Sequence, residues 1–139
     1  MKIILAALLF LTVNVVFAQN KSNGEIKETD TTVFQNVEIE ASVDANLWID
    51  HLRKNLQQPI EKAAKKGMKA GTYAVQVKFL VERDGSIADV QALNDPGYGL
   101  AKAAVKVIRT GPKWAPGIMS GKIVRSYHTQ PITFVIQEM

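Results

Sequence analysis

The chain has 139 residues, which is enough for one domain and a processed end. Its 17 Lys and Arg residues exceed its 13 Asp and Glu residues, so the formal net charge is a mild +4. The absence of cysteine excludes disulfides, thiol catalysis and cysteine-based zinc or iron–sulfur sites. The stability of the protein must therefore come from a hydrophobic core.

The first 18 residues have the pattern of a secretory signal peptide. Lys2 supplies a positive start, the run from Ile3 to Phe17 is almost wholly apolar, and Val16 and Ala18 are small enough for a cleavage site. Cleavage after Ala18 would make Gln19 the first residue of the mature protein. The alternative is an uncleaved membrane anchor, although this run is shorter than the ~20 residues of a spanning helix. We expect an exported protein that is bound to a membrane only if this segment is retained.

The next segment is expected to lead into a single folded domain over residues 33–139. Residues 19–32 are polar and unpatterned, which is typical of a short flexible leader. Apolar and polar residues then alternate from Val33 to Val43, which predicts a half-buried strand.

The first predicted helix begins near Ala45, with Asp44 as its N-cap. Its apolar stripe follows helical spacing and consists of Leu47, Trp48, Leu52 and Leu56. Pro59 is expected to interrupt this helix, because proline lacks the N–H that a helix interior uses. A second short helical segment is expected over residues 60–66, ending at Gly67.

Two strands joined by a tight turn are expected next. Residues 72–82 alternate, with apolar side chains at Tyr73, Val75, Val77, Phe79 and Val81. Asp84-Gly85 is a strong hairpin signal, in which both residues would have positive φ. The return strand is expected over residues 87–93, and residues 94–97 have the composition of a turn.

A second helix and a last strand complete the predicted elements. Residues 100–109 carry an apolar stripe and are followed by Gly111-Pro112, which predicts a helix that stops there. The last strand is expected over residues 123–136, and its Pro131 indicates an edge position or a bulge. This order of elements predicts an α+β two-layer sandwich, with an antiparallel sheet of three to four strands and two helices packed on one face.

No group of residues in the sequence indicates catalysis or metal binding. His51 and His128 each lack a second histidine at ligand spacing, so a surface or interface role is favoured over a metal site. Asp84 and Asp95 are explained by turns, which leaves paired acid–base carboxylates unsupported. We therefore expect a protein that is not an enzyme and has no cofactor.

A cluster of lysines on the first helical region has two interpretations. The cluster lies beside Glu61 and consists of Lys62, Lys65, Lys66 and Lys69. A solvated helix face is favoured over a nucleic-acid or membrane patch, because Glu61 precedes Lys65 by one helical turn. Export also argues against a nucleic-acid partner.

Two sequence elements near the C-terminus are more specific than the rest. They are Pro-x-Trp-x-Pro at residues 112–116 and Pro-Ile-x-Phe at residues 131–134. Three further features accompany them, which are the Asp84-Gly85 hairpin, a turn at Gly121 and the helix that starts at Leu100. Together these features resemble the C-terminal domain of TonB, which transmits force to outer-membrane transporters from the periplasm. The resemblance spans about residues 37–137. Small stand-alone exported proteins of this kind occur in bacteria of the Bacteroidetes type, which is the source that the resemblance suggests.

The resemblance implies a non-enzymatic periplasmic module that binds a protein or peptide. The mechanism it implies is strand addition, in which an extended peptide such as the TonB box of a transporter pairs with an exposed sheet edge. The last strand is the expected edge, because polar and charged residues occupy its first half. The expected contact residues are Val124, Arg125, Ser126, Tyr127, His128, Thr129 and Gln130. For Trp114 and Phe134, packing in the core is favoured over contact with a ligand.

Other roles are open at this point. The same edge could pair with itself, which would give a homodimer and a structural or assembly role in the envelope. Retention of residues 1–18 would instead give a short-tethered energy transducer. A small hydrolase or inhibitor on a similar sandwich would need clustered catalytic residues, which the sequence does not offer.

Overall fold

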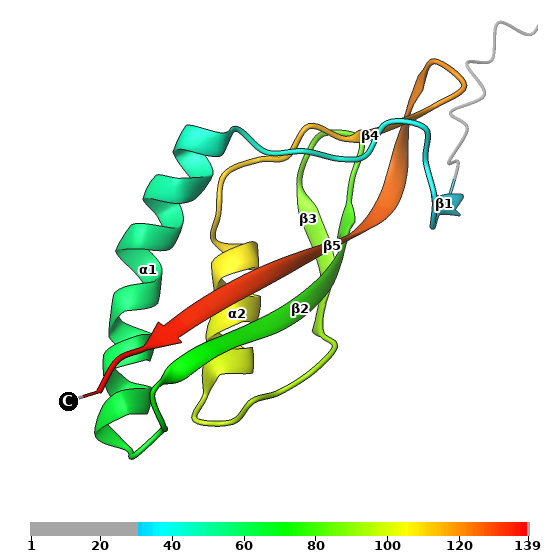
Figure 1. Cartoon of the computed structure of the whole chain (residues 1–139). Helices are drawn as coiled ribbons and strands as arrows, with labels where there is room; N and C mark the ends of the chain where they lie inside the picture. The colour runs from blue at the N-terminus through cyan, green and yellow to red at the C-terminus, as the bar shows by residue number, and fades with distance from the viewer. Residues whose placement is uncertain (1–30, 139) are drawn as a thin grey trace, which may run out of the picture. The chain divides into compact units, whose positions relative to one another are not determined.

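The computed structural model describes residues 31–138 (Figure 1). The expected signal peptide and most of the expected leader lie outside these residues. The bounds of the elements are Val33–Phe34 (β1), Ala45–Lys65 (α1), Gly71–Val81 (β2), Ile87–Ala92 (β3), Leu100–Arg109 (α2), Gly117–Met119 (β4) and Lys122–Ile136 (β5). The α+β class is confirmed, since two helices pack against a curled sheet.

The sheet is organised around β5. This strand pairs antiparallel with β2 along the full length of β2, from Gly71 opposite Ile136 to Val81 opposite Ser126. On its far side β2 pairs with β3, which gives the order β1-β5-β2-β3. β1 pairs with β5 in parallel, so the sheet is mixed and not wholly antiparallel as expected.

The strand expected over residues 33–43 is much shorter in the structure. Only Val33–Phe34 form a strand, and the rest of the segment makes two isolated bridges, Ile39 with Ile118 and Ser42 with Ala115. The alternating pattern therefore reflects an extended segment that touches the chain around β4. It does not mark a long member of the sheet.

Helix α1 is continuous, so the expected interruption at Pro59 is wrong. The helix starts as expected, because the Asp44 side chain accepts a hydrogen bond from the Leu47 N–H at 2.9 Å. Pro59 lies in the helix interior, where it removes one backbone hydrogen bond. The buried residues of α1 lie on both sides of it and are Trp48, Leu56 and Ala63. Packing of both halves on one core outweighs the local cost.

The core lies between the helices and the sheet. Its largest fully buried side chains include Phe79, Phe134, Leu100, Ile108 and Ile132. Trp114 is 4% exposed and belongs to this core, so the expected packing role is confirmed. Its ring lies 5.0 Å from the ring of Phe79 and 5.9 Å from the ring of Trp48, measured between centroids.

The turn between β2 and β3 ties the hairpin to Trp114. Only Gly85 of the expected pair has a positive φ, +82°, and its N–H donates to the Glu82 carbonyl at 2.9 Å. Asp84 instead accepts hydrogen bonds from the N–H and the hydroxyl of Ser86. The hairpin loop is therefore longer than the two-residue Asp-Gly turn expected from the sequence, and its glycine forms a bulge after the turn. Gly85 also accepts a hydrogen bond from the Trp114 N–H at 3.1 Å.

Gly85→Ala is expected to lower the free energy of unfolding by about 3 kcal/mol. The new Cβ would meet the Trp114 carbonyl oxygen, and the left-handed φ of +82° would be strained. Gly121→Ala is the matched control, because Gly121 has a φ of +72° and nothing within 4 Å of an added Cβ. The control should lose only about 1–2 kcal/mol. Urea denaturation measures both values, and equal losses would contradict a role for the contact with Trp114.

Candidate functional site

The first three predicted contact residues pair with short strands of the chain itself. Val124 pairs with Gly117 of β4, and Arg125 and Ser126 lie opposite β1. Val124 and Ser126 are also buried, at 7% and 1% exposure. Ser126 lies between β1 and β2, so the edge position expected for this residue is wrong. The strands that pair with these three residues have two and three residues, which is too short to leave a pattern in the sequence.

Arg125 is held within the fold by an ion pair. Its guanidinium donates to both carboxylate oxygens of Glu82, at 2.6 and 3.0 Å. It also donates to the Thr31 carbonyl at 3.2 Å, just before β1. This side chain therefore joins β5, the end of β2 and the segment that leads into β1.

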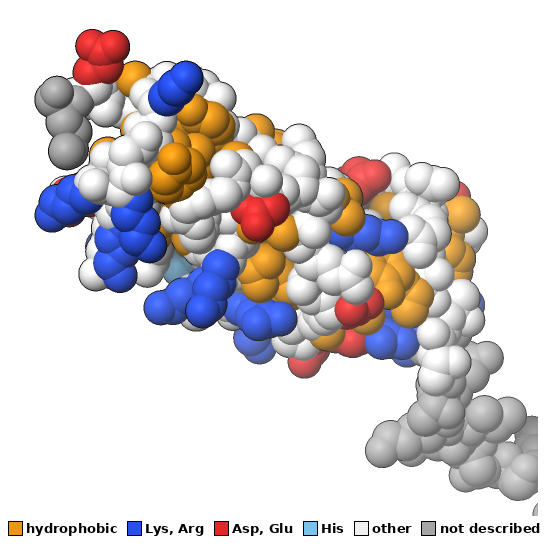
Figure 2. All heavy atoms as spheres, turned by 90° about the horizontal axis from the view of Figure 1, so that it is seen from below, with side chains coloured by type: hydrophobic (Ala, Val, Ile, Leu, Met, Phe, Trp, Pro, Cys, Tyr) orange, Lys and Arg blue, Asp and Glu red, His pale blue; other side chains and the backbone are white. Residues whose placement is uncertain are grey.

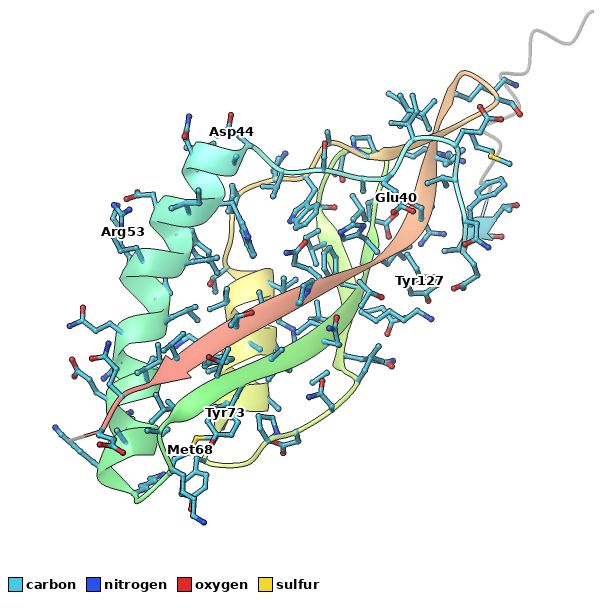
Figure 3. The ribbon with its side chains drawn as sticks, in the orientation of Figure 1. Glu40, Asp44, Arg53, Met68, Tyr73 and Tyr127 are labelled. Carbon is cyan, nitrogen blue, oxygen red and sulfur yellow. The ribbon has the colours of Figure 1, made fainter. Side chains whose placement is uncertain are left out.

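Beyond Ser126, β5 has an open side. β2 occupies one side of β5 as far as Ile136, and no strand among residues 31–138 pairs with the opposite side after Ser126. We call the backbone of residues 127–136 on that side the open edge. Tyr127 marks one end of it in Figure 3. Thr129 is exposed and Gln130 is half-buried.

Hydrogen bonds to β3 show which backbone groups face the open edge. The Gln76 N–H donates to the Asn94 side chain and the Gln76 carbonyl accepts from the Leu93 N–H, both at 2.7 Å. Because the backbone groups of Gln76 point to β3, Pro131, which lies opposite Gln76 on β5, makes no backbone hydrogen bond to β2. The missing N–H of Pro131 therefore removes no hydrogen bond between β2 and β5. Alternation along the ladder then directs the backbone groups of Thr129, Thr133 and Val135 to the open edge. The expectation that Pro131 marks an edge is confirmed.

His128 is an internal packing side chain. Its ring lies 5.1 Å from that of Trp114 and 5.7 Å from that of Phe79, and its Nδ1 lies 3.2 Å from a Glu40 carboxylate oxygen. His51 likewise joins the two helices, since its Nε2 lies 2.9 Å from the Val107 carbonyl oxygen. Within residues 31–138 there is no group of three or more side chains that could hold a metal ion.

Tyr127 anchors the sheet face that points away from the core. Its hydroxyl donates to the Asp89 carboxylate at 2.8 Å, and the Lys78 ammonium lies 4.5 Å from the centroid of its ring. Asp89 has a φ of +50° and lies where the pairing of β2 with β3 shifts register. Such a bulge re-aims side chains, and here it accompanies the contact between Asp89 and Tyr127.

An apolar groove borders the open edge where β5 ends beside α1, and Arg53 marks its α1 side in Figure 3. The groove has a volume of about 570 Å³. Its apolar walls consist of Leu52, Leu56, Ile60 and Ala64 from α1 and Val135 from β5. Its rim carries Arg53, Gln57, Glu61, Lys65, Gln137 and Glu138. The sequence alone does not indicate this groove, because only the fold brings α1 and the end of β5 together.

Residues 61–136 match the family model described as Gram-negative bacterial TonB protein C-terminal. The match covers more than half of the chain. This protein belongs to the TonB C-terminal domain family. Domains of this family are periplasmic and non-catalytic, and they generally bind the TonB box of outer-membrane transporters.

A search of curated proteins gave no match. In the part of the chain that the structure describes, no helix is long and apolar enough to cross a membrane. The TonB match contains the open edge but begins at Glu61, so Leu52, Leu56 and Ile60 of the groove precede it.

Asp89→Asn is expected to lower the pKa of Tyr127. The hydrogen bond to Asp89, followed by partial burial and the charge of Asp89, raises the pKa of Tyr127 above the ordinary 10.0. Because the folded pKa is raised, the stability from this contact is complete below the pKa of an unfolded tyrosine. It is lost as the pH rises through the raised value. Ultraviolet titration measures the change, and Tyr127→Phe identifies the signal. An unchanged titration of Tyr127 would contradict the hydrogen bond.

Proposed function

We propose that this domain captures an extended peptide of an outer-membrane transporter, or of another envelope protein, by strand addition at the open edge. The peptide pairs with β5 between Tyr127 and Val135. This range keeps the last four contact residues expected from the sequence, which are Tyr127, His128, Thr129 and Gln130. Ser126, which lies between β1 and β2, is reached only if β1 leaves β5, and Val124 and Arg125 are not part of the proposed contact.

One observation carries the proposal: the long strand β5 has unpaired backbone groups on one side within residues 31–138. The N–H and carbonyl groups of Thr129, Thr133 and Val135 are oriented for an added strand. Pro131 lies between them and offers a carbonyl but no N–H. A proline in this position limits indiscriminate pairing, in the way that natural sheets protect their edges.

The apolar groove supports a peptide as the occupant. Successive side chains of an added strand point to opposite faces of the sheet, so every second side chain would point to the helix side. Near Val135 that side is the groove, with Leu52 and Ile60 on its α1 wall. We infer that the groove selects an apolar side chain near one end of the bound segment.

The setting that fits this function is the periplasm, after removal of residues 1–18. A module released in this way meets the peptide as a soluble binder. A domain that kept residues 1–18 would act as the short-tethered transducer considered above. Strand addition at the open edge is common to both cases.

Thr133→Pro is expected to weaken peptide binding about fivefold, which corresponds to one net hydrogen bond of ~1 kcal/mol. The Thr133 N–H faces the open edge, so proline removes a donor that the peptide uses and none that β2 uses. Pro131→Val is the reciprocal variant, since it restores a donor and should strengthen binding by a similar factor. The probe is a synthetic TonB-box peptide from a transporter of the same cell, titrated by calorimetry.

Thermal unfolding of both variants checks that the fold is retained. Unchanged affinity in both folded variants would overturn strand addition at this edge. Sedimentation without peptide separates the rival assembly role, because an edge that pairs with itself gives a mass that rises with protein concentration.

Val135→Lys is expected to weaken binding of the same peptide by about tenfold. Val135 lines the groove at the end of β5 and is 51% exposed, so stability should change by less than about 0.5 kcal/mol. Ile123→Lys is the matched control, because Ile123 is 55% exposed on the same strand but pairs with Ile118 of β4. An equal loss in the control would place the peptide away from the groove.

A further inference from the structure

The helix layer carries a second groove, which four lysines line. Lys62 and Lys66 come from α1, and Lys102 and Lys106 come from α2. The other lining residues are Gln58, Pro59, Tyr98, Gly99 and Ala103, so no carboxylate lines this groove of about 390 Å³. We call it the lysine groove. Figure 2 shows Lys and Arg side chains gathered along one side of the face that it displays.

No carboxylate is found in an ion pair with a lysine of the lysine groove in the described part of the chain. All four lysines are exposed, and the ion pairs of Lys and Arg found within residues 31–138 lie elsewhere, at Lys54–Asp50 and Arg125–Glu82. A neighbouring groove along α2 adds Arg109 to Lys102 and Lys106, again without a carboxylate. The first turn of α2 also contains no acidic residue. The partial positive charge of that helix end adds to the charge of Lys102, whereas Lys62 and Lys66 lie at the C-terminal end of α1, whose partial charge is negative.

This arrangement changes the interpretation of the lysine cluster. In the sequence, Lys62 and Lys66 stand beside Glu61, which favours a solvated face. In the fold, α2 brings a second row of lysines against the first, whereas Glu61 lies at the rim of the apolar groove. Two rows from different helices produce a concentrated positive field that neither helix has alone.

We propose that the lysine groove docks this domain on a membrane surface that carries anionic lipid headgroups. Clusters of four to eight basic side chains are typical of protein segments that adsorb to such a surface. Lysine ammonium groups are flexible point charges, which suit mobile phosphate headgroups. Bidentate recognition of a single carboxylate or phosphate favours the planar fork of arginine instead. Four of the five cations in the two grooves are lysines.

Docking through the lysine groove leaves the open edge accessible. α2 packs against β2 and β3, whereas the open edge belongs to β5 on the other side of β2. Membrane docking and peptide capture therefore use separate surfaces of the domain, and a failure of one does not imply a failure of the other.

Cosedimentation with vesicles tests the proposal, using the exported protein purified from the cell envelope. Vesicles of phosphatidylglycerol and phosphatidylethanolamine should bind the protein at low salt, and phosphatidylcholine vesicles should not. Raised salt should release it, because exposed charges are screened over about 10 Å at 0.1 M. Equal binding to both kinds of vesicle, or no binding to either, would overturn the proposal.

Paired variants locate the binding surface. Lys62→Gln/Lys66→Gln and Lys102→Gln/Lys106→Gln should each weaken binding to the anionic vesicles roughly 25-fold, at about fivefold per lysine. Lys113→Gln/Lys122→Gln removes the same charge from exposed positions outside the groove and should have little effect. An equal loss in this control would mean that net charge alone drives binding, which overturns the assignment of the groove.

Two further readouts separate the alternatives. Polyglutamate that binds as tightly as the vesicles would identify a carboxylate-bearing partner and overturn the membrane proposal. Binding of the TonB-box peptide should be the same in all three double variants. A loss of peptide binding in the groove variants would show that the two surfaces are not separate, and would also count against the proposal.

Discussion

The pairing of β2 with β5 is the constraint on which the rest of the structure depends. It runs without a register shift over the full length of β2. It directs Phe79 and Phe134 into the core, where the helices cover them. It also fixes which backbone groups of β5 remain for a partner, since each residue bonds either to β2 or toward the open edge. Folding and recognition thus use alternate residues of the same strand.

Pro131 shows how closely this register is specified. A shift of one residue would turn Ile132 and Phe134 to the opposite face and direct Pro131 toward β2, where its missing N–H would break the ladder. Burial of the apolar side chains and placement of the proline therefore favour the same register. Pro131 makes the open edge a poorer template for pairing with other chains. It also helps to fix the register of β5 against β2.

Local signals in the sequence predicted those elements whose cause is local. The helix over 100–109, the N-cap at Asp44 and the edge position of Pro131 all follow from the properties of nearby residues. Predictions that depend on distant partners were less successful. Pro59 remains in a helix because two halves of α1 share one core, and Val124 to Ser126 are covered by short strands from elsewhere in the chain. Both grooves arise from pairs of elements, so no single segment indicates them.

The length of α1 connects these observations. Because the helix continues through Pro59, it borders the apolar groove through Leu56 and Ile60 and the lysine groove through Lys62 and Lys66. A helix broken at Pro59 would leave these side chains on separate pieces with independent orientations. Continuity of α1 therefore holds a surface suited to an apolar peptide and a surface suited to anionic lipid at a fixed angle. Most of the helix precedes the segment that matches the TonB family model, whereas the four lysines of the lysine groove lie within that segment, so the helix joins matched and unmatched parts of the chain in one rigid element.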